Sequence, residues 1–460
     1  MDHPPFPPFC LARLLRNTFR PRPGERVCIL IDLPDPGLAK GWAFLGDEKF
    51  SIQRHAHDSF YNALHEGVMT ELGLTGGEFF AYEETGGSNL DLPDRAVAPD
   101  GRELSLERDV YPNYDIILCI STHSATAPLT ALAKRHGFRG ATLHGVNDII
   151  LRSGLAVDYN EVSLVTERLR LALTRADFFE IDFKVGDDTH TLRLECDQQE
   201  AQKSHGICLA DEPDVANLPA GEVYFVPTGG EGAFPMQYAD GTLGLQQVTG
   251  GRVTRATLIR GDQAVIDAHN AKLADDPVTG ELGELGFGTQ VLPVSGRDIQ
   301  DEKILGTMHV ATGRSDHLGG DLTPDKFAKA QNATHDDILF SPSKTPDITV
   351  TQVRMHRDGN AIVVLENVYH RVEQGDDPLV AAYLGSRQVG FAIISTTLVV
   401  CAVFVPIMFL AGQTGLLFRE LAIAMIAAIG FSGFISLSLA PMLCSKLLKT
   451  AERGRLARWG

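Results

Sequence analysis

Carboxylate and imidazole side chains concentrate in the second half of this 460-residue chain. Glu222 lies in GEVYFVP and Glu284 in GELGFGT, two segments that alternate as β-strands do, and His309 follows in GTMHVATG. His335 and Asp337 form a His-x-Asp pair, and residues two apart on an extended segment point to the same side. Two imidazoles with several carboxylates and no thiolate suit one or two divalent ions of Zn, Co, Mn or Fe.

A ligand set of this kind can carry out hydrolysis. Two divalent ions bridged by a carboxylate polarise a carbonyl group and activate a water molecule. The same spacing also occurs in His–Asp pairs that only pack in a core or lie at a surface, so the residues alone leave a structural role open. Asp316 and His317, which precede a Gly-Gly turn, add one more carboxylate and one more imidazole to the candidates.

Two kinds of element are expected to position these residues. RVCILIDLP (26–34) and YDIILCIST (114–122) are apolar runs that are each followed by a helical segment, a pattern typical of a parallel α/β sheet. From about residue 178 the pattern changes to period-two alternation with Gly-rich turns, which predicts antiparallel strands. We therefore expect an α/β domain over residues 1–200 and a β-rich, metal-binding catalytic domain over 201–358.

The composition excludes several classes of protein. The formal net charge of −18 argues against a nucleic-acid partner. The 7 cysteines are scattered and form no CxxC pair, so neither a disulfide scaffold nor a thiolate zinc ribbon is expected. The first residues contain Pro and Arg where a secretion signal has its apolar core. A reduced, cytoplasmic environment is expected for the part before residue 359.

The last hundred residues differ in composition from the rest. There are 31 consecutive uncharged residues after Arg387 and 25 after Glu420, and about 20 apolar residues are enough to span a membrane. We expect transmembrane helices at 389–410 and 421–444, which complete a fold class of α/β domain, β-rich domain and two transmembrane α-helices. The basic tail after Cys444 is expected on the cytoplasmic side of the membrane. Two spans return the chain to the same side, so the N-terminal part is expected there as well. The lipid bilayer is then an expected partner of the C-terminal helices.

Four sequence blocks resemble the thermophilic metallo-aminopeptidases of the aminopeptidase T type. These blocks are GEVYFVP, ELGFG, DEKILGTMH and HDD, and they occur in the order of that family's fingerprint over residues 10–355. The resemblance implies that Glu222, Glu284, His309, His335 and Asp337 are metal ligands, with Glu222 or Glu284 acting as bridging ligand or general base. It implies hydrolysis of a small peptide or amide at a free amine, and it leaves formation of a homodimer open.

One position departs from that family's pattern. The family has a Tyr seven residues after the matched His, and this chain has Asp316 there. A carboxylate can bind a metal ion, but it cannot donate a phenolic proton, so Asp316 is a candidate ligand and His317 a candidate substitute. In the same superfamily, 2,5-dihydroxypyridine dioxygenases use one non-haem iron and lack the His at position 309. Because His309 is present here, the hydrolase reading is favoured over the oxygenase reading.

The C-terminal segment resembles an unrelated family, the resistance–nodulation–division efflux pumps. The resemblance is nearly continuous over 360–448, and it implies that residues 359–460 are a fragment of such a pump. The Asp pair that precedes AIVV in those pumps is not in register here, where the sequence is RDGN. Transport by this chain alone is therefore not expected, and a fusion or truncation product is favoured. Three hypotheses remain: a metal-dependent hydrolase, a component of an efflux transporter, and a non-catalytic metal-binding module.

Overall fold

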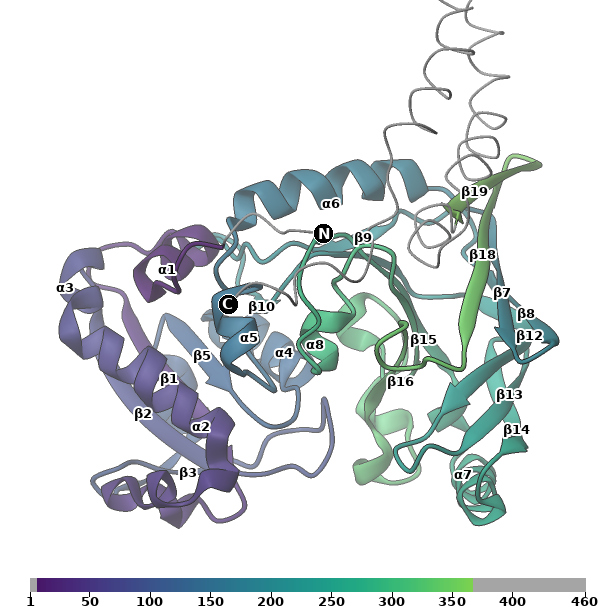
Figure 1. Cartoon of the computed structure of the whole chain (residues 1–460). Coiled ribbons are helices and arrows are strands. Elements are labelled where there is room, and N and C mark those ends of the chain that lie inside the picture. Colours follow the sequence, from purple (N-terminus) through teal and green to yellow (C-terminus); the bar gives the residue numbers. More distant parts are fainter. Residues whose placement is uncertain (1–5, 367–460) are drawn as a thin grey trace, which may run out of the picture. The chain divides into compact units, whose positions relative to one another are not determined.

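Three β-sheets organise the described part of the chain, which comprises residues 6–366 of a computed structural model (Figure 1). The chain divides into two compact units, Met1–Leu365 and Glu366–Gly460. The elements described below belong to the first unit, except that the last strand ends at Glu366, the first residue of the second unit.

The first sheet contains seven strands and is parallel through most of its width. Its spatial order is β10 (Val215–Asn217), β6 (Arg139–Thr142), β5 (Ile116–Ile120), β1 (Arg26–Leu33), β2 (Thr75–Glu83), β3 (Arg95–Val97) and β4 (Glu103–Ser105). The pairs from β10 to β2 are parallel, and the edge pairs β2–β3 and β3–β4 are antiparallel. Successive side chains of a strand point to opposite faces, so Ile29 enters one core and Leu30 the other.

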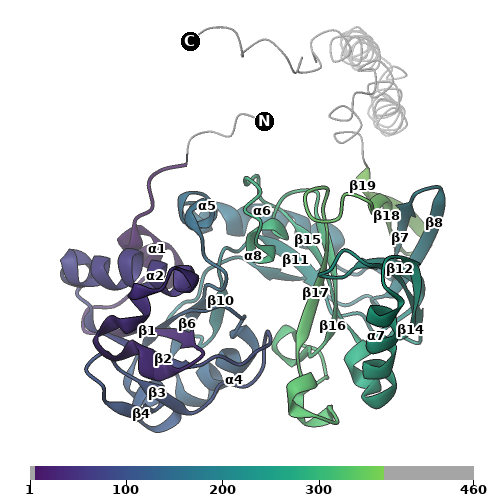
Figure 2. The ribbon, with the colours of Figure 1, turned by 60° about the horizontal axis from the view of Figure 1, so that its bottom comes forward.

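Helices cover both faces of this sheet (Figure 2). They are α1 (Leu11–Phe19), α2 (Ser51–His55), α3 (Met69–Leu72), α4 (Thr126–His136), α5 (Asp148–Arg152) and α6 (Tyr159–Leu173). Apolar residues of α1, α2, α5 and α6 share the core that contains Ile29, whereas Leu129 of α4 packs in the core that contains Leu30. Burial on both faces explains why β1 and β5 are apolar at nearly every position.

The other two sheets are antiparallel and share one core. The order of the seven-stranded sheet is β14 (Arg252–Arg260), β13 (Leu243–Thr249), β12 (Gly229–Gln237), β8 (Asp188–Glu195), β7 (Phe178–Val185), β18 (Thr349–Arg357) and β19 (Asn360–Glu366). The order of the five-stranded sheet is β17 (His335–Phe340), β16 (Met308–Gly313), β15 (Leu282–Gly288), β11 (Glu222–Phe225) and β9 (Gln202–Ser204). Two further helices, α7 (Gln263–Asp275) and α8 (Asp298–Asp301), complete this part.

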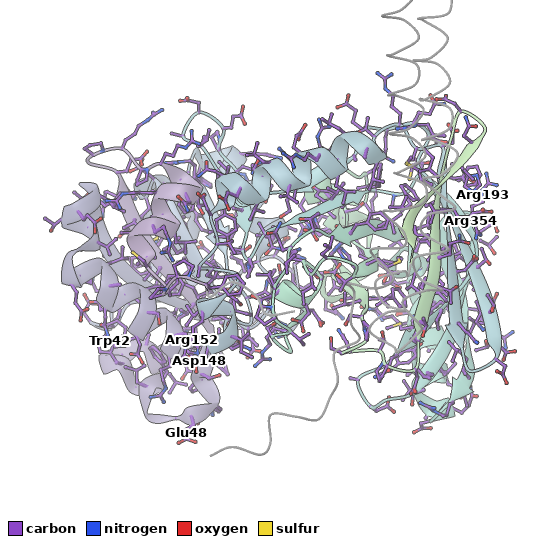
Figure 3. All side chains as sticks on the ribbon, turned by 45° about the horizontal axis from the view of Figure 1, so that its top comes forward. Trp42, Glu48, Asp148, Arg152, Arg193 and Arg354 are labelled. Atoms are coloured by element: carbon purple, nitrogen blue, oxygen red, sulfur yellow. The ribbon has the colours of Figure 1, made fainter. Side chains whose placement is uncertain are left out.

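Strand β7 shows how the sequence alternation builds this core. Phe179 and Phe183 point inward, and their rings lie 5.2 Å from Phe225 and 4.7 Å from Phe340 of the facing sheet. The intervening residues point outward, where Arg354 of β18 forms ion pairs with Glu180 and Asp182. Figure 3 shows Arg354 with Arg193 on this charged outer face.

The chain crosses between the first sheet and the other two more than once. Strands β7 and β8 belong to the antiparallel part, yet β10, which follows them, pairs in parallel with β6 of the first sheet. Helix α6 lies along both parts (Figure 1). The predicted boundary at residues 200/201 lies within this stretch of crossings.

The fold class predicted from the sequence needs one correction. Within residues 6–366, the longest α-helix is α6 with 15 residues, and no helix there is both long and apolar enough to cross a membrane. A span needs about 20 residues, because the apolar layer is about 30 Å thick and each helical residue rises 1.5 Å. The described fold is therefore mixed α/β, and its apolar runs are buried strands. The two transmembrane helices expected at 389–410 and 421–444 are not supported, and both segments lie outside the described residues.

A tight hairpin ends the described fold. Asp358 and Gly359 both have positive φ angles, +53° and +76°, and they connect β18 to β19. This combination is the one that a two-residue turn between twisted antiparallel strands requires, and Asp-Gly is among the sequences that adopt it most readily. The segment TVTQVRMHR forms β18, and the turn leads directly into β19.

Candidate metal centre

Four neighbouring strands of the five-stranded sheet carry five of the six predicted ligands. Glu222 begins β11, Glu284 lies in β15, His309 in β16, and His335 and Asp337 in β17. The register pairs are Glu222 with Gly288, Gly286 with His309, Ala311 with Asp337 and Gly313 with His335. Because side chains alternate with period two, this register places all five on one face of the sheet. The opposite face carries the apolar residues of the shared core.

Two glycines of the ELGFG block make room for this cluster. A Cβ atom at Gly286 would lie 2.1 Å from Cε1 of His309, so only glycine leaves space for that imidazole. A Cβ atom at Gly288 would lie 2.2 Å from the carbonyl oxygen of Ile304 and would exclude the loop that precedes β16. The spacing Glu-x-Gly-x-Gly thus places Glu284 and two positions without a side chain on the same face of β15.

The ligand atoms converge closely. Nε2 of His309 lies 3.3 Å from Glu284 Oε1, and Nε2 of His335 lies 3.1 Å from Glu284 Oε2 and 3.3 Å from Asp337 Oδ1. Nδ1 of His335 lies 2.6 Å from the carbonyl oxygen of Arg314, which accepts its proton and leaves Nε2 facing the carboxylates. Three groups place their ligand atoms within 4.8 Å of one another: Glu222–Glu284–His309, Glu284–His335–Asp337 and Glu302–His309–Asp337.

The carboxylates and imidazoles shift one another's pKa strongly. Burial opposes charge on an imidazole, but the Glu284 carboxylate outweighs it and raises the pKa of His309 to about 10. In the same way, Asp337 raises the pKa of His335. Burial raises the pKa of Glu284, yet the positive charge of His309 more than offsets this and lowers that pKa to about 2. Glu284 is thus held in the charged form that binds cations, whereas a metal ion would have to displace the protons that the raised pKa values keep on His309 and His335.

Two residues of the DEKILGTMH block join the cluster although they were not predicted as site residues. Nζ of Lys303 lies 2.6 Å from Oε2 of Glu222 and 2.5 Å from Oε1 of Glu302, and all three side chains are buried. Burial raises the pKa of Glu302 to about 7. The signal that could have revealed them is their place in the most specific block, six and seven residues before His309.

A cavity of about 180 Å³ opens on the cluster. One side of it is formed by the cluster and by His317, whose ring centroid lies 5.0 Å from that of His335. The other side comes from the first sheet: Ser124 follows β5, His144 follows β6, and Asn217 ends β10. Ligands of open α/β sheets characteristically bind outside the carboxyl ends of such strands. Sequence reasoning missed this wall, because strands far apart in the chain form it.

The sixth predicted ligand, Asp316, is not brought into the cluster. It lies in the 3-10 helix η8 (Asp316–Leu318), and its Oδ1 accepts a hydrogen bond of 2.7 Å from Nε of Arg314. Burial raises the pKa of Asp316, but the nearby His317 and the hydrogen bonds from Arg314 outweigh it and lower that pKa below its ordinary value. Asp316 is absent from the lining of the cavity, which His317 joins.

The donor set fits a divalent cation. Nδ1 of His309 and Oδ1 of Asp337 are buried atoms without a hydrogen-bond partner among the described residues. Oδ1 of Asp337 is 3.3 Å from Nε2 of His335, so the two atoms approach without forming a hydrogen bond. Nε2 of His335 is hydrogen-bonded to Oε2 of Glu284 at 3.1 Å, and a bound ion would replace this contact. Nitrogen and oxygen donors of this kind are the ones that such divalent ions bind.

Comparison with known proteins places a likeness in the C-terminal segment. The model of the AcrB/AcrD/AcrF family matches residues 358–459. The multidrug resistance protein MdtC of Yersinia pseudotuberculosis is 46% identical over 99 residues, which are 22% of this chain and 10% of that protein. MdtC of Yersinia pestis gives the same identity and coverage. The chain thus spans about a tenth of the length of the curated relatives it matches.

These matches confirm the predicted resemblance of the C-terminal segment to resistance–nodulation–division efflux pumps, over a fragment of such a protein. They show no metallo-aminopeptidase family for the preceding residues. The matched range begins at Asp358, the first residue of the turn between β18 and β19. The matched segment therefore begins at the turn before the last described strand, as expected for a chain with fusion-like, partial homology.

Proposed function

We propose that residues 6–366 form a metal-dependent, aminopeptidase-like hydrolase of small peptides or amides. The observation that carries the proposal is the register of β11, β15, β16 and β17, which gathers three carboxylates and two imidazoles beside a cavity. A structural His–Asp pair would need neither the glycine gaps at 286 and 288 nor the unpartnered ligand atoms.

Glu284, His309, His335 and Asp337 would hold one divalent ion of Zn, Co, Mn or Fe, with Glu222 beside it. Such an ion polarises a carbonyl group and lowers the pKa of bound water. We assign Glu222 or Glu284 as the general base, and either of them would act as a bridging ligand only if a second ion were bound. Glu302, whose pKa burial raises to about 7, lies in the range that suits proton transfer near neutral pH.

The remaining walls of the cavity suit a small polar substrate. The carboxylates of the cluster can accept hydrogen bonds from an amine. Ser124, Thr126 and Asn217 on the opposite side offer uncharged hydrogen-bonding groups. A volume of about 180 Å³ leaves room for a small side chain rather than for an extended polypeptide.

The metal content of the full-length protein tests this proposal. Purified wild-type protein should contain at least one divalent ion per chain by emission spectroscopy, and His335→Ala should lose most of it, because the ion loses a ligand and the carboxylates lose a partner. His356→Ala is the matched control, because His356 pairs with Glu180 on the outer face of the β-rich part. A wild-type protein without metal, or an unchanged metal content in His335→Ala, contradicts the assignment. Bound iron with consumption of dioxygen would instead favour an oxygenase.

The match over residues 358–459 favours a second candidate function, that of a component of an efflux transporter. We propose that this segment associates the chain with the cytoplasmic membrane, and that the hydrolase part faces the cytoplasm. Cell fractionation should then recover the chain with membranes, and protease added to intact spheroplasts should leave the tagged N-terminal part uncut. Recovery in the soluble fraction contradicts this candidate and leaves the hydrolase proposal untouched.

A further inference from the structure

Lys303 lies in the middle of the carboxylate cluster, where cations bind. Its side chain is 1% exposed, and its ammonium group lies between Glu222 and Glu302, at 2.6 and 2.5 Å. A buried lysine is rare unless it is paired, and this one is paired twice. Lys303 lies in the loop that connects α8 to β16, and β16 is the strand that carries His309.

The four carboxylates of the cluster fall into two sets. Glu284 and Asp337 approach the imidazoles of His309 and His335. Glu222 and Glu302 instead approach the ammonium group of Lys303, and Oε2 of Glu222 lies farther from Nε2 of His309, at 3.8 Å. Glu284 and Asp337 thus pair with imidazoles, which bind a metal ion when they are neutral. Glu222 and Glu302 pair with the positively charged ammonium group of Lys303.

We propose that Lys303 is a built-in cation that takes the place of a second divalent ion, so that the centre binds one exchangeable ion. A second ion beside the group Glu284–His335–Asp337 would need Glu222, which belongs to the neighbouring group Glu222–Glu284–His309. The ammonium nitrogen of Lys303 lies 2.6 Å from Glu222, so it occupies that carboxylate, and its charge repels another cation. This inference rests on the metal centre of the proposed function and specifies how many ions that centre holds.

The charge of Lys303 is balanced on both sides, because its ammonium group lies 2.6 Å from Glu222 and 2.5 Å from Glu302. Lys203 offers a contrast within the same cavity, because its ammonium group pairs with Glu167 at 2.9 Å rather than with a carboxylate of the cluster. Position, and not the mere presence of a lysine, therefore distinguishes Lys303.

The number of bound Mn²⁺ ions tests the inference without any substrate. The full-length protein is stripped with a chelator and titrated with Mn²⁺ by calorimetry, while paramagnetic resonance detects coupling between neighbouring ions. Wild-type protein should bind one ion and give an uncoupled signal. Lys303→Met should bind two, with the coupled signal of ions about 3.5–4 Å apart, because Glu222 and Glu302 are set free. Lys203→Met should bind one, as the wild type does.

Each other outcome is decisive. Two ions in the wild type overturn the inference and leave the proposed function standing, whereas no ion in the wild type overturns the proposed function itself. One ion in folded Lys303→Met also overturns the inference. If Lys303→Met does not fold, Lys303→Arg keeps the positive charge and should bind one ion, and two ions in that variant overturn the inference.

Discussion

Arg314 decides where the Asp316 carboxylate points. Its guanidinium group is 3% exposed, and it donates to Asp316, to Asp91 and to the carbonyl oxygen of Asn89. Asn89 and Asp91 belong to the loop between β2 and β3, so Arg314 ties β16 to the first sheet. The residue that replaces the Tyr of the resembling family therefore serves a contact between two parts of the fold.

This reading predicts the effect of Asp316→Ala. The buried guanidinium group loses its closest charged partner, so we expect a loss of about 1.5–3 kcal/mol in the free energy of unfolding. Metal content should not change, because Asp316 lies outside the cluster. Asp321→Ala, which removes an exposed carboxylate of the same loop, is the control and should leave stability within about 0.5 kcal/mol of the wild type. Loss of metal in Asp316→Ala would show that Asp316 is a ligand after all.

For individual residues, the sequence predicted the face of a strand on which a side chain lies better than the side chains that it contacts. Period-two alternation was enough to expect His335 and Asp337 on one side of a strand, and the structure has them so. It could not reveal that Lys303 reaches Glu222, because that contact depends on a loop whose path Gly288 permits. Nor could it show that Asp316 turns toward Arg314, since a local change of backbone direction in η8 decides that.

Helix α6 packs in the core of the first sheet and also lies beside β9 and β11 of the five-stranded sheet. On it, Glu167 accepts hydrogen bonds from Arg170, one turn later, and forms an ion pair of 2.9 Å with Lys203 in β9. The hydrogen bonds from Arg170 and then Lys203 lower the pKa of Glu167 to about 2. Strand β9 also pairs with β11, so this contact fixes α6 beside the strand that begins with Glu222.

The lowered pKa predicts a pH dependence of stability. A carboxyl group with a lower pKa in the folded state stabilises that state above its ordinary pKa of 4.5, and this contribution is lost as pH falls through about 2. Glu167→Gln should therefore melt at a lower temperature than the wild type at about pH 6, and the difference should shrink as pH approaches 2. Thermal unfolding followed by circular dichroism across this range measures it. A difference that is independent of pH would attribute the effect to packing.

Elements with strong local patterns were predictable, and short edge strands were not. The apolar run 26–34 became β1, and the helical segment expected after the run 114–122 became α4. Strand β10 escaped prediction, because three residues carry no periodicity and its place beside β6 depends on the tertiary fold. This one strand brings Asn217 to the cavity, so missing it also meant missing part of the site.

For the whole molecule, the boundary with the efflux-pump-like segment coincides with a structural feature. The match begins at Asp358, and its first residues form β19, which lies beside β18 in the seven-stranded sheet. Val364 of β19 packs against the core of the two antiparallel sheets. The mixed α/β fold thus uses seven residues of the matched segment as its edge strand.

Two truncations separate the contribution of this strand from that of the remaining chain. A chain that ends at Glu366 retains all of the compact unit Met1–Leu365, so its melting temperature should stay within about 2 °C of the full-length value. A chain that ends at Arg357 loses the hydrogen-bonded partner of β18 and the contacts of Val364, so it should melt several degrees lower. It should also aggregate more readily, because an unpaired strand edge can pair with another chain. Differential scanning calorimetry and light scattering measure both effects. If the longer fragment is itself insoluble or melts far below the full chain, then residues beyond 366 stabilise the mixed α/β fold, and the segment matched to MdtC contributes to it.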